Sequence, residues 1–247
     1  MTSFEHDTIV PYRDSSLTKK QQVAEMFDRI AFRYDFLNRF LSAGIDKRWR
    51  KKALKQLATE NPKMILDVAT GTGDMAIMAC ELLSPDKVIG IDISEKMLAI
   101  GRKKLLKSGL ERRIELQVGD SETINFPGDS FDAVTVAFGV RNFEHLEQGL
   151  AELHRVLKPG GKLVILEFSK PKITGIKQLY NWYMGRIAPA LGKLFCKNKD
   201  AYQYLNESVQ HFPEREEFVK ILNNTGFTNT SCKNLSLGIC GIYCGVK

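Results

Sequence analysis

The sequence lacks any long, uninterrupted hydrophobic run. Nothing in its 247 residues approaches the roughly 20 consecutive apolar residues that a membrane-spanning helix needs. Residues 1–11 contain acidic side chains and lack the apolar stretch of a secretory signal peptide. From these absences we expect neither an integral membrane protein nor an exported one, but a cytoplasmic protein.

Cysteine is also scarce. The five cysteines are scattered, and only Cys240 and Cys244 share a short spacing. No second ligand pair accompanies them, so the pattern does not indicate a structural zinc site. We expect small buried thiols in a reducing compartment and no metal centre.

Acidic residues are outnumbered, 29 against 36 basic ones, which gives a formal net charge of +7. Such a charge fits a nucleic acid, an anionic membrane surface, or no specific partner. Two basic clusters, at residues 47–55 and 102–113, fall on helical patterns and have no RNA-binding aromatic motif beside them. That context favours solvated helix faces.

An alternation of strand-like and helix-like segments fills most of the chain. Apolar runs at residues 64–69, 87–91, 114–118, 133–138 and 162–168 are separated by helical patterns at 74–83, 94–108 and 144–157. Two further strands are expected near 228–235 and 239–246. This order predicts an α/β fold with a mostly parallel, seven-stranded sheet and helices on both faces. Right-handed crossovers place the carboxyl ends of the parallel strands, and the binding crevice, along one edge.

The two remaining segments are helical in pattern. Residues 16–58 carry apolar side chains at three- and four-residue spacing, before a break at residues 61–62. We interpret residues 1–60 as a helical lid or substrate region and residues 61–247 as the binding domain. That domain carries an insertion at about 172–213, with an amphipathic helix at 176–194, and a later helix at 214–223.

The most informative stretch is the small-residue turn after the first strand, residues 69–73 (ATGTG). Without bulky side chains, the backbone there lets a nucleotide-like ligand approach the N-terminus of the next helix. Asp92 ends the second strand about 20 residues later, where a ribose diol is held. Gly71, Gly73 and Ala76 also match the spacing of dinucleotide-binding enzymes. This turn alone therefore does not show whether the ligand is a dinucleotide or another nucleotide-like molecule.

Three acids at successive strand ends distinguish between these two kinds of ligand. Asp67, Asp92 and Asp120 would repel a pyrophosphate but suit S-adenosylmethionine, which carries a sulfonium and an ammonium group and no phosphate. We assign Asp92, with the adjacent Ile93, to the ribose and Asp120 with Ser121 to the adenine. Asp67 would act at the methionine end, directly or through water. Thr72 would bond the ligand by its hydroxyl or backbone, and Gly71 and Gly73 shape the turn.

The chain resembles the class I S-adenosylmethionine-dependent methyltransferases. The shared motifs are residues 66–73 (LDVATGTG), 90–94 (GIDIS), 119–121 (GDS) and 157–161 (LKPGG). The resemblance implies a Rossmann-like fold and this cofactor. It does not identify the substrate.

A narrower resemblance covers nearly the whole chain from about residue 23. Residues 30–38 (IAFRYDFLN), 137–142 (AFGVRN), 155–171 (RVLKPGG to LEFSKP) and 202–208 (YQYLNES) are similar to the menaquinone/ubiquinone biosynthesis C-methyltransferases. Thr70 stands where many members have glycine, which requires a turn whose backbone angles threonine can adopt. Ala137 stands where some have serine, which weakens any claim for a side-chain contact there.

The family resemblance implies methylation of a ring carbon on a polyprenylated hydroquinone. We favour demethylmenaquinol over a benzoquinol of the ubiquinone pathway. The ring carbon becomes a good nucleophile when a neighbouring hydroxyl loses its proton and forms a phenolate. Because a phenol has a pKa near 10, the site must remove this proton or stabilise the anion. Arg141 is our candidate for stabilising that charge, and Asn142 for orienting the hydroxyl or a water. His145 is a weaker candidate base.

The family motif at residues 30–38, within the expected lid region, supplies the substrate-binding candidates Tyr34 and Asn38. The polyprenyl tail favours peripheral contact with the inner face of the cell membrane, for which residues 176–199 are our candidate wall and surface. The expected partner is the quinol substrate, and we expect no nucleic acid partner. A homodimer is left open. Two alternatives are a nicotinamide-dependent oxidoreductase and a methyltransferase acting on RNA or another small molecule. The acids disfavour the first, and the lack of a base-flipping motif disfavours RNA.

Overall fold

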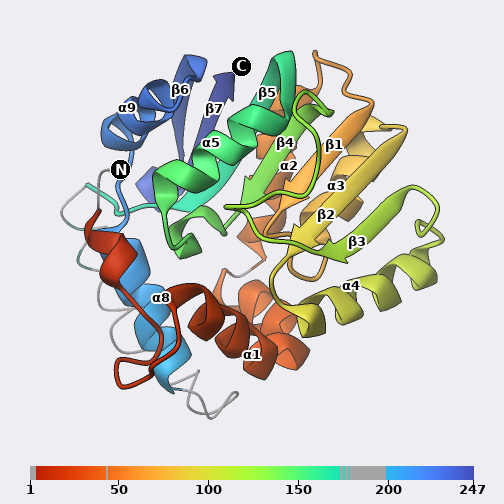
Figure 1. Cartoon of the computed structure of the whole chain (residues 1–247). Coiled ribbons are helices and arrows are strands. Elements are labelled where there is room, and N and C mark those ends of the chain that lie inside the picture. Colours follow the sequence, from red (N-terminus) through yellow and green to blue (C-terminus); the bar gives the residue numbers. More distant parts are fainter. Residues whose placement is uncertain (1–3, 43, 173–174, 176–177, 179–198) are drawn as a thin grey trace.

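The architecture is that of a seven-stranded sheet with helices on both faces, as the sequence predicts (Figure 1). The computed structural model describes residues 4–42, 44–172, 175, 178 and 199–247. The strand order is β3-β2-β1-β4-β5-β7-β6. The strands are β1 (Met64–Val68), β2 (Lys87–Asp92), β3 (Ile114–Val118), β4 (Phe131–Ala137), β5 (Leu157–Phe168), β6 (Thr228–Leu235) and β7 (Cys240–Val246).

The first five strands run parallel, and β7 pairs antiparallel to both β5 and β6. The strand order reverses between β1 and β4, which pair from Ile65↔Ala133 to Val68↔Val136. In an open α/β sheet the crevice for a ligand lies outside the carboxyl ends at such a switch point. The topology therefore fixes where a site should be sought.

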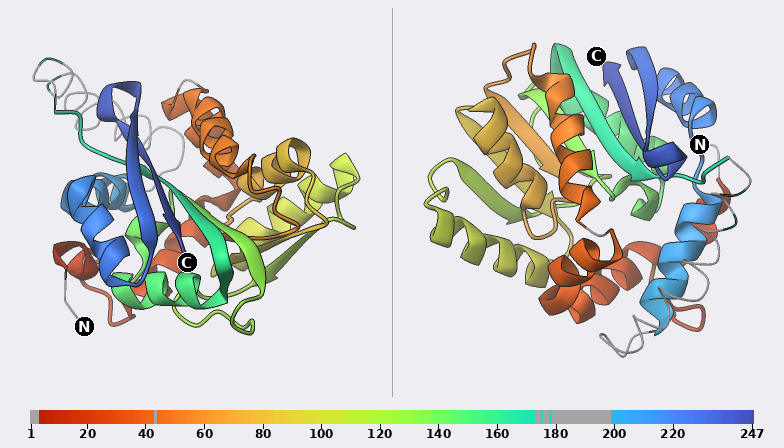
Figure 2. Two further views of the ribbon diagram at one scale, coloured as in Figure 1. Left: turned by 90° about the horizontal axis from the view of Figure 1, so that it is seen from above. Right: turned by 180° about the vertical axis from the view of Figure 1, so that it is seen from behind.

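Two hydrophobic cores fill the two faces of the sheet. On one face α5 (Leu146–Val156) and α9 (Glu216–Asn224) cover the strands, and on the other lie α2 (Ile45–Leu54), α3 (Asp74–Leu83) and α4 (Glu95–Ser108) (Figures 1 and 2). The strands β1 and β4 are buried almost throughout, because both of their faces are covered. Ser94 caps α4, its hydroxyl accepting from the Met97 amide.

Two boundaries differ from the sequence prediction. The fifth strand begins at Leu157, five residues earlier than expected, because Phe131 pairs with Leu157 before the register shifts to Ala133↔Lys162. Residues 158–161 therefore form an irregularity within β5, held by bonds of Gly160 and Gly161 to Lys247. The N-terminal helix is also split, because Gly44 adopts a left-handed conformation between α1 (Lys19–Leu41) and α2.

The N-terminal helix α1 lies across the carboxyl edge of the sheet, and α8 (Lys199–His211) lies beside it (Figure 1). Thr18 begins α1 with a capping box, since its hydroxyl accepts from the Gln21 amide and the Gln21 side chain bonds back. Val23 and Met26 of α1 pack with Ala201 and Tyr204 of α8. The sequence predicts a helical insertion at about 172–213, and α8 lies within it, although its bounds were not predicted. The helix expected at 176–194 lies, except for residue 178, outside the described residues.

Among the described residues, no helix combines the length and the apolar character needed to cross a bilayer.

Candidate functional site

The turn after β1, residues 69–73, forms the first part of the site. The Thr70 amide donates to the Ile91 carbonyl at 3.0 Å, which ties the turn to β2. Ala69 and Gly71 take the positive φ angles, +53° and +58°, so Thr70 does not need one. The threonine is accommodated for that reason. A Cβ at Gly71 would lie 3.3 Å from Met97 Cε, inside the space that a ligand needs.

The ends of β1 and β4 approach each other closely at the switch point. A Cβ on Gly139 would lie only 2.5 Å from the Cβ of Ala69. Phe138, with φ of +61°, turns the chain there and stacks on Phe168 at 4.5 Å between ring centroids. This tight junction forms the floor of the pocket.

Asp92 lies at the centre of the carboxyl edge. Its carboxylate accepts from the Gly71 amide at 2.8 Å and from the Ser94 amide at 2.9 Å. Burial raises the pKa of Asp92 to about 6, although these backbone bonds oppose the rise. The carboxylate is held at the pocket wall between the glycine turn and α4, where it can accept a pair of hydroxyls.

Asp67 lies behind the wall rather than on it. Its side chain is buried and accepts from the hydroxyls of Thr70 and Thr135, each at 2.6 Å. Burial raises the pKa of Asp67 to about 6. The carboxylate thus supports the Thr70 turn from below.

Asp120 lies in the loop after β3 and is paired with α1. Its Oδ2 accepts from Lys20 Nζ at 2.5 Å, and its Oδ1 from the Glu122 amide at 2.9 Å. Lys20 also reaches Glu122, 3.3 Å away. Sequence reasoning found Asp120 but had no signal for Lys20, which is 100 residues away in the chain.

One pocket joins most of these groups. Among the described residues, its lining includes Lys20, Val23, Phe27, Tyr34, Ala69, Gly71, Asp92, Ile93, Met97, Gly119, Asp120, Ser121, Glu122, Ala137, Phe138, Gly139, Asn142, Phe143 and Glu144. Of the predicted site residues, Gly71, Asp92, Ile93, Asp120, Ser121, Tyr34 and Asn142 line it. Asp67, Thr72, Gly73, Asn38 and Arg141 are not in this lining and lie around it.

The lining carries four acids and one described cation, Lys20, which is already paired with two of those acids. Such a wall repels a pyrophosphate and attracts a cationic ligand. Together with the side-chain-free backbone at Gly71, the residues fit S-adenosylmethionine better than a dinucleotide.

Three further links hold α1 over the edge. Asp28 accepts from Ser94 Oγ at 2.6 Å, Asp35 accepts from Thr72 Oγ1 at 2.6 Å, and Arg39 donates to Asp74 at 2.6 Å. Lys104 adds bonds to Thr72 and Asp74 at 2.8 and 2.9 Å. The Thr72 hydroxyl is therefore engaged between α1 and α4 in this structure.

Arg141 is buried beneath the pocket after β4. Its Nη1 donates to Glu167 Oε1 at 2.7 Å and to the Phe138 carbonyl at 2.6 Å. Burial by itself lowers the pKa of Arg141, but Glu167, Tyr34 and Tyr204 together outweigh it and the pKa is raised. The guanidinium is thus kept charged. Its ion-pair partner is Glu167 at the end of β5.

Asn142 and Tyr34 both line the pocket. The Tyr204 hydroxyl of α8 donates to Asn142 Oδ1 at 3.1 Å. Burial raises the pKa of Tyr204, and it also raises the pKa of Tyr34, where a hydrogen bond from Asn38 acts in the opposite direction. Asn38 therefore reaches the site through Tyr34.

Two residues that sequence reasoning left out now belong to the site, Glu167 and Tyr204. Both lie inside the motifs that carried the family resemblance, at residues 166–171 and 202–208. The signal was present, but only the sheet order and α8 show which side chains they hold.

His145 begins α5, with its Nδ1 3.0 Å from Glu122 Oε2 and its side chain 56% exposed. Ligand atoms of Glu122, Glu144 and His145 lie within 4.8 Å of one another. Glu122 already accepts from the amides of Glu144 and His145 at 2.7 and 3.0 Å. Protein donors thus account for this cluster, and it carries no proposal of a metal.

Comparison with known proteins gives matches along nearly the whole chain. The model of the ubiE/COQ5 methyltransferase family matches residues 15–247. A demethylmenaquinone methyltransferase of Bacteroides fragilis is 44% identical, covering 99% of this chain and 100% of that protein. The ubiquinone/menaquinone biosynthesis C-methyltransferase UbiE of Geotalea daltonii is 47% identical, covering 94% and 99%.

Solved structures match in fold. The [4+2]-cyclase SpnF has a TM-score of 0.68 at 17% identity, covering 92% of this chain and 96% of its own. A SAM-dependent methyltransferase from Aquifex aeolicus has a TM-score of 0.58 at 21% identity, covering 80% and 88%. At these identities the similarity establishes the Rossmann-like architecture alone.

Proposed function

The chain belongs to the ubiE/COQ5 methyltransferase family, and we propose that its substrate is demethylmenaquinol, which it methylates at a ring carbon. It is a C-methyltransferase that uses S-adenosylmethionine. The full-length similarity to the demethylmenaquinone methyltransferase of Bacteroides fragilis carries the choice of the naphthoquinol. The UbiE relatives named for both pathways keep the benzoquinol as the alternative.

When bound, S-adenosylmethionine supplies an electrophilic methyl group. Asp92 would accept its ribose hydroxyls, beside Ile93, and Asp120 with Ser121 would receive the adenine. The backbone of Gly71 leaves room for the ligand, while Asp67, Thr72 and Gly73 hold the turn in shape. The acids of the lining favour the cationic methionine end.

Arg141 is our candidate for stabilising the substrate oxyanion. A phenol must lose its proton for the neighbouring ring carbon to become nucleophilic, and a fixed, buried cation favours the phenolate. Arg141 is charged and clamped by Glu167 and the Phe138 carbonyl. As a permanently protonated group it holds charge and does not abstract the proton.

Asn142, which lines the pocket, would orient the substrate hydroxyl or a water that takes its proton. Tyr204 fixes Asn142 through its side-chain oxygen, which leaves the Asn142 amide group free to donate. Tyr34, on α1, would contact the ring, and Asn38 would position Tyr34. In this proposal α1 is a lid whose closure completes the site.

A polyprenyl tail keeps the substrate in a bilayer, because each buried methylene contributes roughly 0.8 kcal/mol. We propose that the enzyme works as a peripheral protein at the inner face of the membrane. The candidate contact at residues 176–199 lies largely outside the described residues.

The direct test supplies the purified chain with methyl-labelled S-adenosylmethionine and reduced demethylmenaquinone, or a reduced benzoquinone precursor, in parallel. We expect label in the naphthoquinol. Preferential labelling of the benzoquinol would overturn the substrate choice. Labelling of neither, with NADH binding in place of S-adenosylmethionine, would overturn the reaction class.

In cells, deletion of the gene should lead to accumulation of the desmethyl naphthoquinone in the lipid extract. An unchanged quinone profile would contradict the proposal.

A further inference from the structure

The outward face of α1 carries an aromatic stripe, which we define as Phe32, Phe36 and Phe40. The side chain of Phe32 is 93% exposed, that of Phe36 53% and that of Phe40 47%. Four-residue spacing puts them on one side of the helix, and the rings of Phe36 and Phe40 stack at 5.8 Å. Large apolar side chains grouped in this way on a surface mark an interaction site.

In the half of α1 that carries the stripe, Asp35 and Arg39 point toward the sheet edge, where they bond Thr72 and Asp74. Tyr34 of the same half lines the pocket, whereas the side chains of the stripe are exposed. Ordinary packing of a surface helix puts its apolar side chains inward. Here two charged side chains face the sheet edge and three phenylalanine side chains are exposed on the outward face.

Cations flank the stripe. We define the cationic flank as Arg33 on α1 and Lys47, Arg48 and Lys51 on α2, all exposed. None of the four forms an ion pair with another described residue, and the one acid of α2, Asp46, is buried and bonded to Arg39. Within the described part of the chain, the flank is therefore a positive surface with no acid paired to it. Ile45, 38% exposed, adds an apolar side chain where α2 begins.

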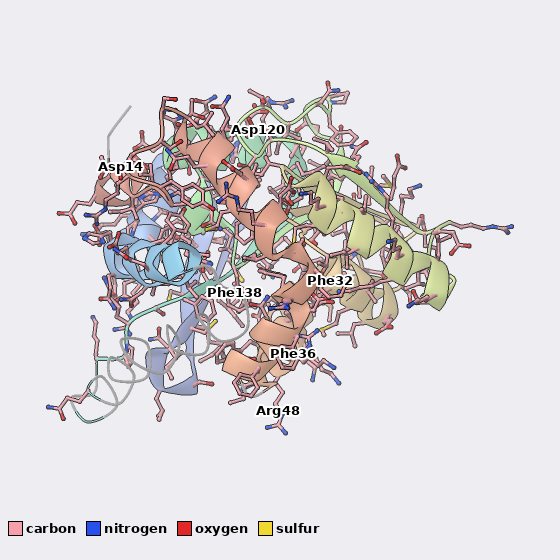
Figure 3. The ribbon with its side chains drawn as sticks, turned by 90° about the horizontal axis from the view of Figure 1, so that it is seen from below. Asp14, Phe32, Phe36, Arg48, Asp120 and Phe138 are labelled. Atoms are coloured by element: carbon pink, nitrogen blue, oxygen red, sulfur yellow. The ribbon has the colours of Figure 1, made fainter. Side chains whose placement is uncertain are left out.

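Stripe and flank lie on the same side of the molecule as the site. Figure 3 looks at the carboxyl edge of the sheet and shows Phe32 and Phe36 on α1, with Arg48 beyond them. Tyr34, which lines the pocket, belongs to the same helix turn as the stripe. A surface bound to α1 would thus be separated from the site by the width of one helix.

We propose that the aromatic stripe and the cationic flank dock this enzyme on an anionic bilayer, with α1 lying in the interface. The aromatic rings enter the boundary between headgroups and acyl chains, and the cations meet the phosphates. This inference rests on the proposed function, because it gives a tailed quinol a route from the bilayer to the pocket. The cationic flank also contributes to the net charge of +7, and in this proposal it binds anionic lipid.

RNA is the other polyanion that this charge fits, and the observations favour the bilayer. A flank that binds RNA uses aromatic rings as stacking platforms along a charged groove. Here the rings form a row along one side of a helix, and Arg39, Lys104 and Arg50, the cations on the inner side of α1 beside the stripe, are paired with acids. RNA binding is therefore an outcome of the test.

The experiment measures co-sedimentation of the full chain with vesicles of phosphatidylcholine, with and without 30% phosphatidylglycerol. One variant is Phe32→Ala, matched by Leu106→Ala, since Leu106 on α4 is also exposed, at 68%. The second is Lys47→Glu with Arg48→Glu, matched by Lys103→Glu with Lys107→Glu, which changes the net charge equally on exposed positions of α4.

We expect binding to the anionic vesicles that weakens in high salt, and little binding to neutral ones. Phe32→Ala should lower the partition coefficient about tenfold. The charge reversals at 47 and 48 should lower it more, at about fivefold for each cation removed. The α4 controls should bind as the unaltered chain does.

Equal losses in the α4 controls, or unchanged binding in the α1 and α2 variants, would overturn the proposal. So would a labelled RNA whose binding depends on the flank while vesicle binding does not. Methylation of a short-chain quinol in solution separates the two proposals. The variants should keep that activity, and its absence in the unaltered chain would count against the function and not against the docking surface.

Discussion

Glu167 and Arg141 form a buried ion pair beneath the pocket, with 2.7 Å between Oε1 and Nη1. The pair joins the end of β5 to the turn after β4, two adjacent strands of the sheet. Glu167 also accepts from the Arg141 amide at 3.3 Å and from the Phe168 amide at 2.9 Å. The carboxylate therefore fixes both the backbone and the charge of Arg141.

Glu167→Gln should impair turnover and stability together. Removing one partner of a buried ion pair leaves an uncompensated charge, which costs about 3–5 kcal/mol of unfolding free energy. Turnover should fall at least tenfold, because the guanidinium loses its fixed position, while affinity for S-adenosylmethionine stays unchanged. Urea unfolding, turnover and calorimetric titration measure the three quantities.

The control for that variant is Glu60→Gln, which breaks an exposed pair with Lys162 and should cost less than about 1 kcal/mol. A Glu167→Gln enzyme that keeps full turnover would remove Arg141 from the proposed charge stabilisation.

Tyr204→Phe should lower turnover about tenfold and leave the dissociation constant of S-adenosylmethionine unchanged. The substitution deletes the bond to Asn142 Oδ1 and lets the amide rotate. Tyr243→Phe is a matched control, since its buried hydroxyl accepts from the Arg215 amide at 2.9 Å, away from the pocket. That variant should lose stability but not turnover. Equal loss of turnover in both would assign Tyr204 a purely structural role.

The sequence predicts the sheet edge well because local rules govern it. Asp92 ends an apolar strand, the glycine turn precedes a helix by a fixed spacing, and a parallel order brings these ends together. Helix α3 has the predicted bounds for the same reason, since its capping glycine and apolar period are both local.

The contacts made by α1 could not be predicted in this way. Lys20 and Asp120 are separated by 100 residues, and only the path of α1 across the edge joins them. The periodicity of Val23 and Phe27 correctly indicated an inward stripe, but it did not show that the outward face further along is aromatic. Tertiary packing decides which face of α1 is covered.

Asp92→Asn should weaken the binding of S-adenosylmethionine by about 10- to 100-fold, because a carboxylate accepts two hydroxyls where an amide accepts one. Burial raises the pKa of Asp92 to about 6, so the affinity of the unaltered enzyme should fall as the pH drops through 6. The asparagine variant should show no such dependence. Asp86→Asn, at an exposed position before β2, is the control for titration calorimetry. A pH-dependent affinity that survives in Asp92→Asn would exclude Asp92 as the titrating group.

Asp67→Asn should become more stable, relative to the unaltered chain, as the pH rises from 4.5 to 7.5. Burial raises the pKa of Asp67 from 3.8 to about 6. Its stabilising contribution is therefore complete below pH 3.8 and is lost as the pH rises through 6, because the folded state binds the proton more tightly. Asparagine does not titrate, its oxygen can accept from one of the two threonine hydroxyls, and its amide nitrogen can donate to the other. The difference in unfolding free energy between the two chains should change by about 2 kcal/mol over that range. Urea titrations at the two pH values measure it, and a constant difference would mean that Asp67 stays ionised in the folded protein and that Thr70 and Thr135 compensate fully for its burial.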